Sequence, residues 1–296
     1  MPRRWLRVAA CQMFADEDIE QNTRRIVERL RACARQKVDV AAFHEGVLFG
    51  YSTRPAFWSR LDQSRITKAE RRIQRVCREK GIAAVVGSTH LANGERYNSL
   101  LVVDRDGSLQ GRYGKIHLAG ERWCEPAQHL PIYRLCGVPC SFLICHDIRY
   151  PELVRLPAAA GAKVCFFSSC ESSVTSEYKL SAYRAMPISR ATENGIYVVM
   201  ANAPADPSDI NRAGSSHGES KVIHPDGNVM EKAGIFTEET VIQNLDLDKA
   251  SRGVALRAVN DMTRIREWMQ EGVKLVDYAS TSRNGRVRRA KKKQRA

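Results

Sequence analysis

The sequence predicts a layered α/β sandwich, and three observations lead to this prediction. Of the 296 residues, 43% are apolar and 27% charged, a globular balance that excludes a disordered, fibrous or disulfide-scaffold protein. Apolar, strand-like segments alternate with segments of helical spacing along most of the chain. Two hairpins interrupt the alternation, so the strands form mixed sheets whose apolar faces need helices to cover them.

The first half of the chain alternates strands with helices and ends in a hairpin. Apolar residues such as Ile26 and Leu30 recur near helical spacing, and Gly81 ends the second helix. The hairpin turns at Asp106-Gly107, where we expect a type I′ turn because Asp and Gly tolerate positive φ. The expected elements are strands at 5–12, 38–43 and 82–89, helices at 17–36 and 66–81, and a hairpin at 98–113.

Near-continuous apolar strands dominate the second half. The segment 138–145 is apolar almost throughout, as in a strand buried on both faces, and it places Cys145 at its carboxyl end. Pro151 then suits the first turn of a helix, where its missing N–H costs nothing. The expected elements are strands at 138–145, 163–170, 196–203 and 240–247, helices at 151–162, 176–193 and 261–273, and a hairpin turning at 225–228.

The net charge of +14 is uneven along the chain. Residues 283–296 hold eight Lys and Arg and no acid, whereas the other 282 residues carry 39 basic and 33 acidic groups. We therefore divide the chain into a domain over 1–282 and a basic tail over 283–296. The tail is either a solvated, disordered end or a salt-dependent contact with polyanions, such as nucleic acid or a membrane surface.

Other features bear on location and on cofactors. No run of about 18 apolar residues could span a bilayer, and the basic N-terminus lacks the apolar core of a secretory signal. Nine cysteines, an odd number, suit free thiols in a reducing compartment, so we expect a soluble, cytoplasmic protein. Cys136 and Cys140 lack a second pair, and no phosphate-binding glycine motif follows a strand. We expect neither a metal nor a nucleotide cofactor.

Three reactive side chains each follow a strand-like segment, where a loop can expose them on a rigid scaffold. They are Glu45, Lys115 and Cys145. Taken alone, Glu45 could be an exposed acid in a loop, and Lys115 could be part of an ordinary polar loop. Cys145 is more informative, because its apolar strand breaks into a polar turn before a proline-led helix. Backbone N–H groups there can stabilise a thiolate or an oxyanion, while Glu45 and Lys115 could supply a base and a cation.

These three segments resemble the nitrilase, or carbon–nitrogen hydrolase, superfamily. The similarity runs from about residue 5 to residue 275 and keeps the three motifs in the family's order. It rests on FHEGVLFGY around Glu45, YGKIHL around Lys115 and ICHDIRYPE around Cys145. Two later blocks, RATENGIYVVMAN at 190–202 and GSSHGESKVIHPDG at 214–227, are similar to further family segments.

The resemblance implies a four-layer α-β-β-α sandwich and a role for each motif residue. Cys145 would attack an amide-like carbon, and Glu45 would accept its proton and later activate water. Lys115 and the backbone N–H of His146 would stabilise the tetrahedral intermediate. Glu121 resembles the family's second glutamate, although Glu125 lies close enough in sequence to compete for that role. Ammonia or an amine would leave from a thioester acyl-enzyme.

The chain also departs from the family pattern. His44 replaces a frequent Pro, Gly114 a common Arg, and Pro126-Ala127 a frequent Pro-Gly, but none of these removes a catalytic side chain. His146 stands where nitrilases usually carry a Trp-Glu pair. The sequence therefore favours amide or N-carbamoyl substrates over nitriles, with the nitrile reading kept as an alternative.

Substrate choice and assembly are less constrained by the sequence. Arg149 matches a common family Arg that either pairs structurally or contacts substrate. Glu171, in the segment 168–178, is expected beside the pocket and would suit a cationic end such as that of a carbamoylated polyamine. The resemblance also implies at least a homodimer. The main rival is a catalytically idle scaffold whose basic tail binds nucleic acid, and the presence of Glu45, Lys115 and Cys145 argues against it.

Overall fold

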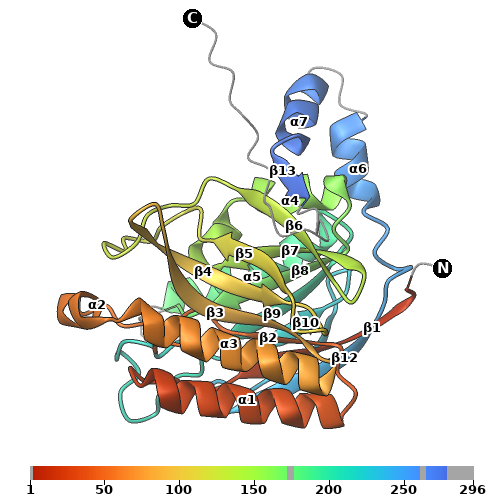
Figure 1. Ribbon diagram of the computed structural model, residues 1–296. Helices are drawn as coiled ribbons and strands as arrows, with labels where there is room; N and C mark the ends of the chain where they lie inside the picture. The colour runs from red at the N-terminus through yellow and green to blue at the C-terminus, as the bar shows by residue number, and fades with distance from the viewer. Residues whose placement is uncertain (1–2, 172–176, 261–264, 279–296) are drawn as a thin grey trace, which may run out of the picture.

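The computed structural model of the chain describes residues 3–171, 177–260 and 265–278. Within them, two β-sheets stack face to face and helices cover both outer faces, which gives four layers (Figure 1). The predicted α-β-β-α sandwich is confirmed. The basic tail over 283–296 and the first four residues of the predicted helix at 261–273 lie outside the described residues.

The first sheet has six strands in the order β12-β1-β2-β3-β4-β5. Its central strands β1, β2 and β3 are parallel, and the outer pairings are antiparallel. The strands are β1 (Trp5–Gln12), β2 (Val40–Phe43), β3 (Ala83–Ala92), β4 (Glu95–Val103), β5 (Leu109–Gly114) and β12 (Glu239–Asp246).

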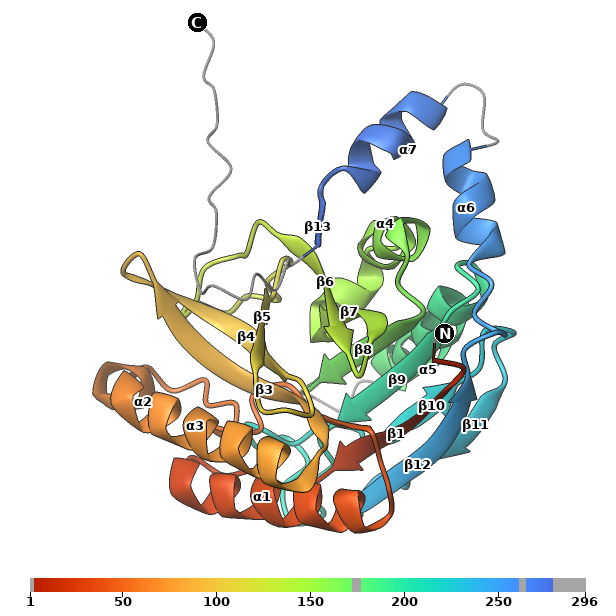
Figure 2. The same ribbon diagram turned by 45° about the vertical axis from the view of Figure 1, so that its right-hand side comes forward.

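Two long amphipathic helices, α1 (Ile19–Arg35) and α3 (Gln63–Lys80), lie side by side on the outer face of this sheet (Figure 2). Each begins at an aspartate, Asp18 or Asp62, whose carboxylate accepts hydrogen bonds from the first-turn N–H groups. Gly81 ends α3 in the left-handed conformation at φ 65°. A short helix that the sequence did not predict, α2 (Pro55–Arg60), precedes α3.

The second sheet has seven strands in the order β11-β10-β9-β8-β7-β6-β13. Helices α4 (Glu152–Ala160) and α5 (Glu177–Thr192) pack against it, and α6 (Gly253–Asn260) and α7 (Arg266–Val273) pack against α4. The strands are β6 (Leu130–Leu135), β7 (Val138–Ile144), β8 (Val164–Ser169), β9 (Tyr197–Asn202), β10 (Lys221–Ile223), β11 (Val229–Lys232) and β13 (Val276–Tyr278). The sequence did not predict strands β6 and β13 or helix α6.

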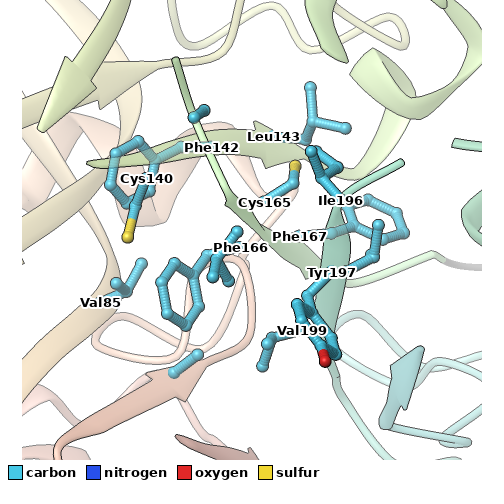
Figure 3. Close-up of a cluster of buried hydrophobic side chains, with 14 of the residues drawn as sticks. Val85, Cys140, Phe142, Leu143, Cys165, Phe166, Phe167, Ile196, Tyr197 and Val199 are labelled. Carbon is cyan, nitrogen blue, oxygen red and sulfur yellow. The ribbon is translucent and has the colours of Figure 1, made fainter. Parts of the chain in front are cut away.

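The apolar strands at the centre of the second sheet are buried on both faces, as their unbroken hydrophobicity predicts. Figure 3 shows Val85 of β3 facing Cys140 and Phe166 across the space between the sheets, while Leu143 and Phe167 point to the opposite side. All of these side chains are fully buried. The core therefore continues from the first sheet through the second to its covering helices.

The hairpin between β4 and β5 differs from the predicted type I′ turn. Gly107 has a φ of 79°, but Asp106 does not have the positive φ that such a turn requires. The Gly107 N–H donates to the Asp104 carbonyl at 2.9 Å, and the strand register shifts next to Val103. The type I′ prediction is therefore wrong, because a turn with one left-handed glycine followed by a bulge closes this hairpin.

The strands that precede the reactive residues end at one edge of the sandwich. Strand β2 of the first sheet ends at Phe43, and β7 and β8 of the second sheet end beside it. The Ser168 hydroxyl donates to the Phe43 carbonyl at 2.8 Å and so joins the two sheets at this edge. Residues that directly follow these strands are therefore brought together, as is usual for ligand sites at the carboxyl ends of parallel strands.

Candidate active site

Cys145 lies on a strained turn at the end of β7. Its φ is +43°, a left-handed conformation that is costly for any residue with a β-carbon. A short 3₁₀ helix, Cys145–Arg149, begins at this residue. The side chain is buried, and it lies at the floor of a cavity. The strand therefore presents the thiol on a rigid, sharply bent support.

Asp147 holds this turn in place. Its carboxylate accepts hydrogen bonds from the Ile144 N–H at 3.1 Å and from the Tyr113 hydroxyl at 2.8 Å. It also accepts the His117 N–H at 2.8 Å, which ties the Cys145 turn to the loop that carries Lys115. Burial raises the pKa of Asp147 to about 6, although these three donors favour its anion.

Glu45 reaches the site because a glycine opposite it leaves room. A β-carbon on Gly87 of β3 would lie only 2.1 Å from the His44 carbonyl and 2.4 Å from the Gly46 nitrogen. The loop after β2 can therefore lie directly on β3, where the Leu48 N–H donates to the Gly87 carbonyl at 3.1 Å. This packing turns the Glu45 carboxylate inward.

Lys115 links two buried carboxylates. Its ammonium lies 2.9 Å from Glu45 Oε1 and also contacts Glu121 Oε1 directly. Glu45 accepts further hydrogen bonds from the Asn98 side-chain amide at 2.7 Å and from the Cys170 N–H at 3.1 Å. Every one of these side chains is fixed by at least one neighbour, so the charges are held in position before any ligand arrives.

The charges in this network shift one another's pKa values. Burial raises the pKa of Glu45 to about 6, because the attraction of Lys115 only partly offsets desolvation and the Glu121 charge adds to it. Burial opposes the charge of Lys115, but the acidic groups around it raise the pKa of its ammonium well above the usual value. Burial likewise opposes the charge of Glu121, and its contact with Lys115 lowers its pKa overall. Lys115 is thus held as an ammonium between the carboxyl groups of Glu45 and Glu121.

The structure separates the two candidates for the second glutamate. Glu121 contacts Lys115, accepts the Tyr51 hydroxyl at 3.1 Å and is largely buried. Glu125 has an exposed side chain, and its backbone N–H donates to the Arg96 carbonyl at 2.8 Å. The geometry therefore favours Glu121.

The site opens into a cavity of about 800 Å³. Aromatic rings line one side of it, with Trp58 stacked on Trp123 at 3.9 Å between ring centroids. The volume suits a small molecule rather than a polypeptide chain. Its polar lining consists of Thr53, Glu121, Arg122, Cys145, His146, Arg149, Cys170 and Glu171 together with the Tyr51 hydroxyl.

All three predicted contact residues line this cavity. Glu171 Oε2 lies 3.3 Å from Cys145 Sγ and accepts the thiol hydrogen. Arg149 is exposed, and its guanidinium lies 5.5 Å from the Tyr183 ring centroid. It has no carboxylate partner within the described part of the chain. His146 is half-buried against Tyr150, and burial lowers the pKa of its imidazole.

The sequence reasoning missed Asn98, Tyr51 and Asp147, all of which contact the charged groups or shape the turn. Asn98 lies within β4, directly before the apolar part of that strand, and nothing in its neighbourhood distinguishes it. Asp147 follows Cys145 by two residues, and an acid so close to a candidate nucleophile is a usable signal. Tyr51 lies within the Glu45 motif, where an aromatic residue also fits a plain packing role.

Within the described ranges, no group of three or more His, Cys, Asp or Glu side chains could hold a metal ion. All nine cysteines fall in these ranges and are free thiols. None of the helices in the described part of the chain has the length and apolar character needed to cross a membrane.

The four-layer fold is shared with a solved amidase structure of the nitrilase superfamily, and in this chain a buried ammonium and its carboxylates lie beside the thiol at the floor of the cavity. The family model for carbon–nitrogen hydrolases matches residues 7–252. The chain belongs to the carbon–nitrogen hydrolase family, and the resemblance predicted from its motifs is confirmed.

Individual relatives include amidases. The chain is 29% identical over 188 residues to 2-oxoglutaramate amidase of Bacillus subtilis, which covers 60% of this chain and 68% of that protein. It is 26% identical over 264 residues to N-carbamoylputrescine amidase of Solanum tuberosum, with coverage of 83% and 88%. A mutant of the Nesterenkonia AN1 amidase superposes with a TM-score of 0.76 at 23% identity, covering 90% of this chain and 98% of that one.

Proposed function

We propose that this enzyme hydrolyses a non-peptide C–N bond of a small amide or N-carbamoyl compound through a thioester on Cys145. The observation that carries the proposal is the position of the Cys145 thiol, which lies at the floor of the cavity beside the buried Glu45–Lys115–Glu121 network. A nucleophile, a base and a fixed cation are the three groups that acyl transfer needs. The curated amidases among the relatives support the choice of bond.

In the first half-reaction, the Cys145 sulfur attacks the carbonyl carbon while the thiol proton passes to Glu45. The new C–S bond pushes the carbonyl electron pair onto oxygen, where the Lys115 ammonium and the His146 backbone N–H stabilise it. Such donors each contribute about 3–4 kcal/mol in other hydrolases. Glu121 keeps Lys115 in place through their contact. The C–N bond then breaks, and the nitrogen takes the proton from Glu45 and leaves as ammonia or an amine.

The second half-reaction reverses these roles. Glu45 removes a proton from water, and the resulting hydroxide attacks the thioester carbon. The C–S bond breaks, the sulfur regains a proton from Glu45, and the acid product leaves. The pKa of Glu45 of about 6 suits both duties, because a base is most effective when its pKa lies near the working pH.

We expect kcat/KM to fall about tenfold per pH unit below about pH 6. Glu45 must be ionised to accept the thiol proton, and burial raises its pKa to about 6, so acid removes the base. A profile of kcat/KM against pH measures this acidic limb, the fall in kcat/KM below about pH 6. Since the pKa of Asp147 is also raised to about 6, Asp147→Asn is the necessary control. The limb persists in that variant if Glu45 is responsible, and its disappearance there would transfer the assignment to Asp147.

The proposal is tested by ammonia or amine release from primary amides, ω-amides, N-carbamoyl amines, N-carbamoyl amino acids and nitriles. Turnover of an amide or carbamoyl compound, with an acyl adduct detected by intact mass, supports it. Release from nitriles alone would favour the nitrilase alternative. Truncation after residue 282 separates this proposal from the alternative of an idle scaffold. A hydrolase confined to 1–282 keeps its turnover, whereas a scaffold that binds nucleic acid through its basic tail loses that partner.

We also propose that the chain forms a homodimer or a larger homo-oligomer. Apolar side chains on and beside α7 are exposed, with Trp268 64%, Leu275 68% and Ile265 41% accessible. Together with Leu156 of α4 and Ala258 of α6, Trp268 and Ile265 line a shallow apolar pocket. An exposed apolar patch of this kind is typical of a subunit interface.

A further inference from the structure

The positive charge of the folded domain is concentrated in one layer. Helices α1 and α3 together hold 12 basic and 4 acidic residues, a net charge of +8. Residues 1–282 as a whole carry only +6, so the remaining residues of that range are slightly acidic. Figure 2 shows the two helices as the outermost layer over the first sheet. This positive surface therefore belongs to one face of the sandwich and lies in a different part of the chain from the basic tail.

A line of cations runs along α3. Five basic residues recur three or four positions apart, and this spacing places them on one side of the helix. All five are exposed, and together they extend about 20 Å, because an α-helix rises about 1.5 Å per residue. These residues are Arg65, Lys68, Arg71, Arg75 and Arg78.

Helix α1 widens this surface. Arg24, Arg31 and Arg35 are exposed on it, seven and four positions apart, and so lie on one side of that helix as well. An ion pair between Arg72 and Glu20, at 2.6 Å, joins the two helices, and packed helices lie about 8–10 Å apart. The five residues of α3 and the three of α1 form what we call the cationic face.

The acids of the protein do not neutralise the cationic face. None of its eight side chains forms an ion pair with a carboxylate in the described part of the chain, whereas the half-buried Arg25 and Arg72 of the same helices each pair with a glutamate. Like charges three and four positions apart destabilise a helix. The cationic face is therefore unfavourable in the protein alone, and an anion from outside would relieve this repulsion.

We propose that the cationic face docks the phosphate backbone of a nucleic-acid duplex, without regard to base sequence. This interaction surface goes beyond the proposed function and does not depend on the active site. A duplex carries one negative charge for about every 1.7 Å of its axis, so a length of about 20 Å offers enough phosphates for all eight cations. Seven of the eight are arginines, whose planar guanidinium pairs with two phosphate oxygens at once.

The composition of the two helices argues against other partners. In α1 and α3, which the structure describes in full, no large apolar side chain is exposed. Helices that bind a membrane surface insert such side chains among the lipids. Single-stranded nucleic acid stacks its bases on aromatic rings, and protein interfaces are anchored by aromatic side chains. A duplex backbone needs only the positive charges that this face supplies.

Binding of a labelled duplex to the full-length protein tests the proposal. Fluorescence anisotropy measures the association constant K for a DNA duplex of about 20 base pairs between about 50 and 200 mM salt. The variant Lys68→Gln/Arg71→Gln/Arg75→Gln removes three charges of the cationic face, and glutamine retains a good helix propensity. The slope of log K against log salt concentration should become shallower by about three, since each phosphate contact contributes about one. Affinity at about 100 mM salt should fall about 100-fold.

The variant Arg134→Gln/Lys249→Gln/Arg257→Gln is the matched control. It removes the same number of exposed charges from β6, from the segment after β12 and from α6, and it should leave the slope unchanged. An unaltered slope in the first variant would mean that the basic tail carries the binding, and this result overturns the proposal. An equal loss in the control also overturns it, because net charge alone would then explain binding.

Two further measurements complete the test. Tighter binding to the matching single strand, or to phosphatidylcholine vesicles with about 30% phosphatidylserine, would overturn the choice of a duplex as partner. Thermal melting followed by circular dichroism distinguishes lost binding from lost folding. The Lys68→Gln/Arg71→Gln/Arg75→Gln variant should be at least as stable as wild type, because it relieves repulsion along α3. Arg75→Gln alone should make the slope shallower by about one.

Discussion

Replacing Cys145 with alanine is expected to lower amide hydrolysis by about 10⁵- to 10⁶-fold, the loss seen when a catalytic nucleophile is removed. The reason is that Cys145 alone of the described thiols lies on the strained turn that ends β7, whereas Cys170, the other thiol that lines the cavity, follows β8 and contacts Glu45 through its backbone N–H. We expect the free energy of unfolding to change by less than about 1 kcal/mol, because only one buried sulfur is lost and the backbone is unaltered. Steady-state turnover and urea unfolding measure the two effects.

Two further variants sharpen this result. Cys136→Ala removes a half-buried thiol that contacts the Asp39 carbonyl, away from the cavity, and should retain turnover. Cys145→Gly should be as inactive as Cys145→Ala but more stable by about 1 kcal/mol, because glycine relieves the strain of a φ of +43°. Substantial turnover in Cys145→Ala would mean that the nucleophile lies elsewhere.

Replacing Lys115 with methionine is expected to affect both catalysis and folding. The variant loses the oxyanion's ammonium donor, a cost of about 10²–10³ in kcat for one such group. It also leaves Glu45 and Glu121 buried without their shared cation. Breaking a buried ion pair in this way destabilises proteins by about 3–5 kcal/mol. Chemical unfolding at pH 7.5 measures the second effect.

The pH dependence of that loss has a definite sign. Without Lys115, desolvation and mutual repulsion raise the folded-state pKa values of Glu45 and Glu121 above those of the unfolded chain. Groups with raised values contribute full stability below the unfolded pKa and lose it as pH rises. Lys115→Met should therefore recover stability relative to wild type between pH 7.5 and pH 5. Lys68→Met, at an exposed position on α3, should show no such recovery. Equal stability of wild type and Lys115→Met at pH 7.5 would contradict the buried-pair argument.

Several elements were predictable because local periodicity is strong in them. The spacing of Ile26 and Leu30 predicted α1, and the unbroken apolar run before Cys145 predicted β7. Short elements such as α2 and β13 carry too few residues for a period to emerge. The β4–β5 turn was mispredicted because a Gly107 at positive φ fits two turn types, and only the hydrogen bonds of Asp104 distinguish them.

The sequence by itself determined the layered α/β class and the family, and it predicted the three motif residues, because these depend on local patterns and on short motifs in one chain order. Only the tertiary structure decided which side chains meet. It placed Asn98 on Glu45, placed Glu121 and not Glu125 against Lys115, and brought Glu171 to the thiol. The partners of Glu45 lie 53 to 125 residues away along the chain, and no local pattern encodes contacts made by folding two sheets onto one edge.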